Sequence, residues 1–134
     1  GRAVGEGNRG SFVPRAAARD DRETFRRYLD SVFMYAGTVS VARDAQKPSF
    51  EALRAGDFFV LPGGPGHAIL ILDVAKDDRG RRIALLGQGF MPAQDFHVLA
   101  SSEPTKPWFA LDVEAVDTPF WQEPFARSAL RRLE

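Results

Sequence analysis

The sequence predicts an α+β domain in which an antiparallel sheet, curved like half a barrel, packs on one long N-terminal amphipathic helix. Two observations predict this fold class. After residue 20, apolar residues recur every three or four positions, which is the period of a helix. Further along, short apolar runs alternate with turns rich in Gly, Pro and Asp, which is typical of antiparallel strands.

The helix is expected to run from Asp20 to about Arg43. Asp20 and Asp21 supply N-cap candidates and negative charge at its start, and both stabilise a helix there. Gly37 is either a tolerated weak point within it or a place of close backbone approach. Residues 1–19, rich in Gly, Arg and Ala, are expected to form an extended lead-in, so that residues 20–134 make a single α+β domain. The apolar positions of the helix are Phe25, Tyr28, Leu29, Val32, Phe33 and Ala36.

The second half of the chain is expected to supply the sheet. Residues 67–74 are apolar on both faces of a strand, which indicates a central strand covered on both sides. The Asp-Asp-Arg-Gly sequence within residues 76–81 predicts a hairpin turn to a returning strand. Further strands are expected at residues 58–61, 82–87 and 108–116, and helical turns at 49–53 and 124–133.

Composition excludes several classes of function. The 134 residues carry 18 Lys and Arg against 18 Asp and Glu, so a general binder of nucleic-acid phosphates is not expected. The chain has no run of apolar residues long enough to cross a membrane. With no cysteine, these residues can form neither a disulfide nor a thiolate nucleophile, and no cofactor is expected.

The two histidines are the candidate reactive groups. His67 opens the predicted central strand directly after a glycine-rich turn, where we expect its ring to line an open cleft, on the same face as Asp73. His97 closes a polar cluster that also contains Gln88 and Gln94, and Gln88 is expected to face His67 across the hairpin. A packed, hydrogen-bonded role explains each histidine equally well.

Other side chains are weaker candidates. Tyr35, Thr38 and Ser40 lie late in the predicted helix, away from a helix N-terminus that would activate a nucleophile. The late aromatic residues are expected to pack in the core or as a lid: Trp108, Phe109, Phe120, Trp121 and Phe125.

A metal-dependent enzyme is one alternative. The glycines and the histidine of residues 56–67 fit the second metal-binding motif of cupins, but Ile71 stands where that motif has Asn, and the first cupin motif is absent. His67 and His97 could also hold a metal together with Asp73 or Asp95.

Three blocks of the sequence resemble the bacterial domain of unknown function 4846, from about residue 13 onwards. They are the helix with its Tyr-Ala-Gly-Thr at 35–38, the segment from Gly56-Asp57 through Pro65-Gly66-His67-Ala68 to Asp73, and residues 85–99, which include Phe-Met-Pro-Ala-Gln at 90–94. Members of this family are typically longer at the N-terminus, so the chain is expected to be the C-terminal part of a longer family domain.

The His67 segment is also similar to papain-like cell-wall amidases of the NlpC and CHAP type. This resemblance implies a papain-like topology, with His67 as the base and Gln88 as the group that orients it. It also implies a cleft shared with Gln94 and His97, with Tyr35 and Asp73 as further binding residues. No residue matches the family's Cys nucleophile, so the chain is expected to be inactive or incomplete.

The same resemblance implies a cell-wall peptide or glycan as partner and a cell-envelope or secreted location. A non-catalytic domain that binds a glycan or peptide in that cleft is the second alternative.

Overall fold

In the computed structural model of the chain, the described residues are 2–6, 9–13, 17, 19–90, 94–101 and 106–133. Among these, the side chains of residues 2–12, 33–35, 90 and 94 lie outside the description. The chain divides into two compact units, residues 1–37 and residues 38–134. The family-domain boundary at residue 20 stays a prediction.

The first unit contains a hairpin and a helix. Strands β1 (Arg2–Glu6) and β2 (Arg9–Val13) pair antiparallel within the lead-in. Helix α1 (Arg22–Tyr35) begins after Asp21, whose carboxylate accepts a hydrogen bond from the Thr24 N–H at 2.8 Å. This N-cap satisfies one of the amide groups that a helix start leaves without a partner.

The predicted continuous helix to Arg43 is wrong. Helix α1 ends at Tyr35, and Ala36 adopts an extended conformation with φ −88° and ψ 92°. A second helix, α2, then spans Thr38–Asp44 in the second unit. The physical reason is the Ala36–Gly37 pair: glycine weakens a helix, and the break places Thr38 at the start of a new one.

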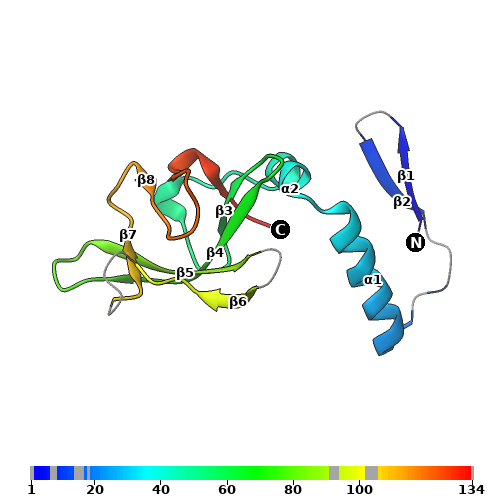
Figure 1. Ribbon diagram of the computed structural model, residues 1–134, viewed down its shortest axis with the longest axis horizontal. Helices are drawn as coiled ribbons and strands as arrows, with labels where there is room; N and C mark the ends of the chain where they lie inside the picture. The colour runs from blue at the N-terminus through cyan, green and yellow to red at the C-terminus, as the bar shows by residue number, and fades with distance from the viewer. Residues whose placement is uncertain are drawn as a thin grey trace. The chain divides into compact units, whose positions relative to one another are not determined.

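The second unit is built on an antiparallel sheet, which confirms the predicted α+β class. Its strands follow the order β10-β3-β4-β5-β6, so the strand that begins at His67 is central, as predicted. Strand β5 also pairs with β7 (Trp108–Ala110), and Figure 1 shows β6 and β7 against different parts of β5. The other bounds are β3 (Phe58–Leu61), β4 (His67–Lys76), β5 (Arg82–Phe90), β6 (Gln94–Val98) and β10 (Leu130–Arg131).

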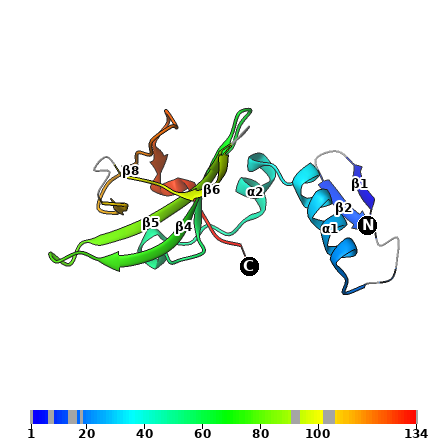
Figure 2. The same ribbon diagram turned by 60° about the horizontal axis from the view of Figure 1, so that its bottom comes forward.

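The predicted hairpin joins β4 and β5, which lie side by side in Figure 2. The Asp77 carboxylate accepts from the N–H groups of Arg79 and Arg81 at 2.9 and 2.8 Å, and Gly80 supplies the positive φ of 76° that the turn needs. The pairing register shifts between Ile71 and Asp73, which marks a bulge in β4.

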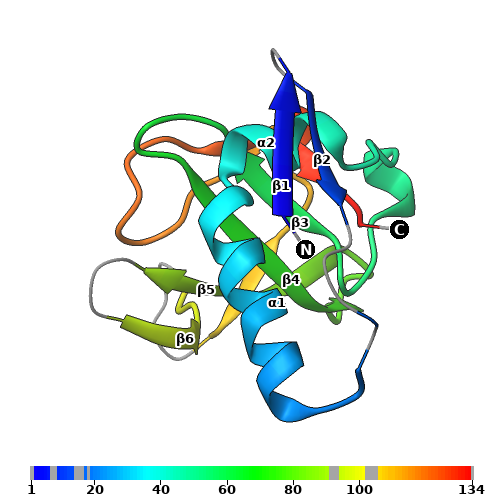
Figure 3. The same cartoon turned by 90° about the vertical axis from the view of Figure 1, so that its right-hand side faces the viewer.

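The two faces of the sheet bury different cores. Alternate residues of β3, β4 and β5 point into a larger core, which is formed by Leu53, Phe59, Ile69, Ile71, Ala84, Leu86, Leu99, Phe109, Leu111, Val116, Phe125, Ala129 and Leu130. The opposite face packs on α2 in a smaller core of Ala42, Phe58 and Val60. Figure 3 shows α2 beside β3. Strand β3 is buried on both faces, which explains its continuous apolar sequence. Strand β4 is fully buried only on the face of the larger core, because on its other face Ala68 is exposed and Leu70 is partly buried.

The end of the chain differs from the prediction. The expected strand at 108–116 is two short strands, β7 and β8 (Ala115–Val116), separated by the exposed residues 112–114. The expected helical turn at 124–133 contains β9 (Phe125–Ala126), a 3-10 turn at Arg127–Ala129 and β10. Strand β8 leaves the main sheet because it pairs with β9. A 3-10 helix at Phe50–Ala52 confirms the predicted helical turn there.

A buried ion pair ties the C-terminal strand to the start of β3. Asp57 is 1% exposed, and its two carboxylate oxygens accept from Nε and Nη2 of Arg132 at 2.6 and 2.8 Å. The backbone of Asp57 also bonds to Ile71, through Ile71 N and Asp57 O at 2.8 Å. Asp57 therefore binds β4 through its backbone and the C-terminal end of the chain through its side chain.

Candidate functional site

The structure brings His67 and Gln88 together. His67 is the first residue of β4 and Gln88 lies near the end of β5, and the two atoms His67 Nε2 and Gln88 Oε1 are 2.6 Å apart. Both side chains are on the face of the larger core, with exposed fractions of 7% and 1%. An amide oxygen only accepts hydrogen bonds, so in this arrangement Nε2 carries the proton and donates a hydrogen bond to Gln88 Oε1.

Aromatic rings enclose the imidazole. The Trp121 ring stacks on it with a centroid distance of 4.6 Å and an interplanar angle of 18°. The Phe125 ring lies tilted against it at 6.1 Å. The expectation that the ring lines an open cleft is therefore wrong: the segment before β9 covers it. This contact joins residues that are 54 positions apart in the sequence.

The buried atoms Gln88 Nε2 and Thr118 Oγ1 have no hydrogen-bond partner among the described residues. An unsatisfied buried donor costs about 1–3 kcal/mol, so such groups are uncommon in cores and mark places where a ligand or water can bind. Gln88 has its amide oxygen bonded to His67, while its amide nitrogen has no hydrogen-bond partner in the part of the chain that the structure describes.

His97 lies on the same face, one strand further along. It is the register partner of Gln88 across β5 and β6, and partners in an antiparallel pair point to the same side. Its Nδ1 is 2.9 Å from the backbone oxygen of Asp95. Because a carbonyl only accepts, Nδ1 carries the proton, and Nε2 of the neutral ring keeps a lone pair.

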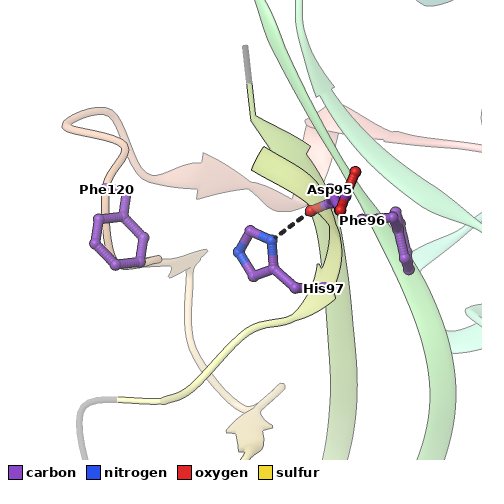
Figure 4. Close-up of a pocket in the computed structure, with 4 residues that line it drawn as sticks. All are labelled: Asp95, Phe96, His97 and Phe120. Atoms are coloured by element: carbon purple, nitrogen blue, oxygen red, sulfur yellow. Dashed lines mark hydrogen bonds between the residues drawn. The ribbon is translucent and has the colours of Figure 1, made fainter. Parts of the chain in front are cut away.

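A hollow of about 440 Å³ opens beside His97, lined by Asp95, Phe96, His97 and Phe120. Figure 4 shows the rings of His97 and Phe120 facing this space, whereas the Phe96 ring points to the other side of β6. Phe120 is 71% exposed, and its φ of 74° lies in the left-handed region that non-glycine residues rarely adopt. Phe120 is therefore not a core residue, contrary to the expectation for the late aromatic residues, and no signal in the sequence indicates its backbone conformation.

The remaining predicted site residues are not assembled with this pair. Asp73 is exposed and accepts from the Val74 N–H at 2.8 Å. At the rise of an extended strand it is about 20 Å along β4 from His67. Tyr35 lies in α1 and Gln94 in β6, and their side chains are outside the described part of the chain.

Thr38 and Ser40 were expected inside a helix and away from its N-terminus, which is wrong, because α2 begins at Thr38. This helix packs on the smaller core, on the face of the sheet opposite to His67. Thr38 instead contacts Gly66, where an added Cβ would also lie 2.8 Å from Leu61 O. Gly66 is therefore needed for the close approach of α2 to the turn before β4.

Within the described ranges, no three His, Asp or Glu side chains lie close enough together to hold a metal ion. The pairs that the metal hypothesis needs, His67 and His97 with Asp73 or Asp95, do not form such a group. His67 Nε2 is engaged with Gln88. The described site consists of imidazole, amide and aromatic groups.

The fold and the site define an α+β domain with a buried His–Gln pair on the central strands of an antiparallel sheet. The chain belongs to the family described as domain of unknown function (4846), whose model matches residues 1–132. Comparison with curated proteins finds no match, and neither does comparison with solved structures. Across the ranges that the structure describes, no helix is both long and apolar enough to span a membrane.

Proposed function

We propose that residues 38–134 carry the base half of a papain-like acyl-transfer site, which acts on an amide bond of a cell-wall peptide. In this proposal His67 is the general base and Gln88 orients it. The sequence contains no cysteine. A thiol nucleophile must then come from outside these residues, and the 134 residues alone do not hydrolyse an amide by thiol chemistry.

The hydrogen bond between His67 Nε2 and Gln88 Oε1, at 2.6 Å, is the observation that carries the proposal. It sets the tautomer, because Nε2 is the donor and Nδ1 is left with the lone pair. Nδ1 is then the atom that accepts a proton from a nucleophile. A base held in one tautomer and orientation by a third group is the general arrangement of nucleophile–base–orienter sites.

The aromatic enclosure supports the same role. Stacking on Trp121 and contact with Phe125 restrict rotation of the imidazole about its χ angles. Exclusion of water also strengthens the bond to Gln88, because a hydrogen bond gains electrostatic strength in a low-dielectric environment. Both effects keep the base oriented before a substrate binds, which is what efficient proton transfer requires.

Hydroxyl groups on α2 are not proposed as the nucleophile. Thr38 and Ser40 begin this helix, but α2 packs against Phe58 and Val60, on the face of the sheet opposite to His67. A proton acceptor must be within hydrogen-bond reach of the group it activates.

The test is thiol reactivity in the full polypeptide that the gene encodes, including any sequence upstream of residue 1. We expect a cysteine that reacts with iodoacetamide at pH 6 at least tenfold faster than a free cysteine. We expect His67→Ala to remove this excess, Gln88→Ala to reduce it, and Asp78→Asn, in an exposed turn, to leave it unchanged. A full polypeptide without cysteine, or a thiol whose rate ignores His67→Ala, refutes the proposal.

A non-catalytic binding domain is the second candidate, and the hollow beside His97 and Phe120 favours it. The two candidates differ in one measurement. A binding domain leaves its ligand chemically unchanged, and its full polypeptide contains no cysteine whose rate of reaction with iodoacetamide depends on His67.

A further inference from the structure

Phe120 has features that folding stability does not explain. A phenylalanine in the left-handed region is strained, because its Cβ approaches the following carbonyl. Burial of the ring would offset this strain, but the ring is 71% exposed. A strained backbone that presents an apolar ring to solvent is the kind of outlier that points to a binding role.

The ring faces a polar acceptor. His97 is fixed from β6 by its Nδ1 bond to Asp95 O at 2.9 Å, and Figure 4 shows its other nitrogen, Nε2, on the side of Phe120. In the neutral ring this nitrogen accepts a hydrogen bond from a ligand O–H or N–H. The hollow between them, about 440 Å³, is a shallow depression that is open to solvent and has room for one small ring.

We propose that Phe120 and His97 form a clamp for a sugar ring. A pyranose has an apolar C–H face that lies flat on an aromatic ring and hydroxyl groups at its edge that donate to an acceptor such as His97 Nε2. One sugar ring can therefore pack on Phe120 and donate a hydrogen bond to His97 Nε2 at the same time. A purely aromatic side chain would cover Phe120 but give His97 Nε2 no donor.

The position of the clamp relates it to the His67–Gln88 pair without depending on it. His97 is the register partner of Gln88, so a bound sugar lies one strand away from the base, on the same face of the sheet. The buried Gln88 Nε2 has no partner among the described residues and is a donor on that face. If the acyl-transfer function holds, its substrate is an amide attached to a sugar.

The experiment is an NMR titration of the 134-residue chain with two probes, chitotetraose and cellotetraose. We expect at least one to shift the ring signals of Phe120 and His97 at millimolar concentration or below. Phe120→Tyr should keep the affinity within about threefold, while Phe120→Ala and His97→Ala should each weaken it at least tenfold. Phe25→Ala removes a phenylalanine of similar exposure, 60%, from α1 and should leave affinity unchanged.

Phe120→Gly separates a binding role from a structural one. Glycine adopts a φ of 74° without strain, so this variant should be as stable as the parent or more stable, and yet lose binding. The clamp is refuted if neither saccharide binds, if affinity survives Phe120→Gly, or if N-acetylphenylalanine amide binds where the saccharides do not. Saccharide binding and the His67-dependent thiol are separate readouts, so either proposal can fail while the other stands.

Discussion

Asp57 and Arg132 form a bidentate ion pair that joins the start of β3 to the end of the C-terminal strand. The two N···O distances are 2.6 and 2.8 Å, and Arg132 also donates from Nη2 to the Ala52 carbonyl at 2.9 Å. The carboxylate accepts a further bond from the Arg54 N–H at 2.9 Å. Both carboxylate oxygens are therefore used, in a position that is almost without solvent.

Asp57→Asn should destabilise the second unit by roughly 2–4 kcal/mol, because it leaves the partly buried guanidinium of Arg132 without its counter-charge. Urea unfolding at pH 7 measures this difference. Asp78→Asn, in the exposed hairpin turn, is the control and should change the free energy of unfolding by less than about 0.5 kcal/mol. Equal effects of the two substitutions would contradict a stabilising role for the pair.

The same pair predicts a dependence on pH. Burial raises the pKa of Asp57, but the hydrogen bonds and charges of Arg132 and Arg54 outweigh it, so the pKa lies below its ordinary value of 3.8. A carboxyl with a lowered pKa in the folded state contributes stability above its unfolded pKa, about 3.9, and loses it as pH falls through the folded value.

The stability difference between the parent and Asp57→Asn should accordingly be constant from pH 7 to about pH 4 and shrink below that. Subtraction of the two curves removes the contribution of other carboxyls with lowered pKa, such as Asp21, Asp44 and Asp77. A difference that stays the same down to pH 2 would show that Asp57 does not titrate in this way.

Gly66→Ala should destabilise the second unit by roughly 1–3 kcal/mol through overpacking. An added Cβ would lie 2.8 Å from Leu61 O and 2.9 Å from Gly63 N, and both are backbone atoms that cannot turn away. Gly64→Ala is the matched control, since its Cβ meets no atom within 4 Å. Thermal unfolding of the two variants compares them directly, and similar melting temperatures would contradict the close approach.

His67→Ala should cost roughly 2–4 kcal/mol, because it removes the stacking on Trp121 and leaves the buried Gln88 Oε1 without its donor. His97→Ala, at a half-buried position, should cost less than about 1 kcal/mol. Chemical denaturation distinguishes the two. A negligible cost for His67→Ala would mean that the ring is more accessible than its 7% exposure indicates.

Local signals in the sequence predict much of the sheet. The β4–β5 hairpin follows from the Asp77–Gly80 turn, and the central place of β4 follows from apolar residues on both of its faces. The split of residues 108–116 is harder to predict, because β8 pairs with β9, and that pairing depends on the arrangement of residues distant in sequence. The break between α1 and α2 coincides with Gly37, whose low helix propensity alone does not decide between a weak point and an end.

The candidate site was predictable only in part. The hairpin alone does not place Gln88 on the face of His67, because the register near the turn pairs odd residues with odd ones. The bulge between Ile71 and Asp73 shifts this register and brings Gln88 to the face of His67, and nothing in the sequence marks the bulge. The cover supplied by Trp121 does not follow, because it depends on the path of a loop between β8 and β9. The exposure of Phe120 does not follow from the sequence either. The hydrophobicity of phenylalanine predicts burial in most cases, and it carries no information about the backbone angle φ.

Strand β5 has neighbours along both of its sides. Strand β4 covers one side, while β7 pairs with residues 83–85 and β6 with residues 87–90 on the other. The long hairpin therefore offers few unbonded amide groups on β5 to which another polypeptide could add a strand. Self-association through β-sheet extension should therefore start at a strand other than β5. Loss of either short strand, β6 or β7, would expose unpaired backbone N–H and C=O groups along part of β5, and another strand could then pair with them.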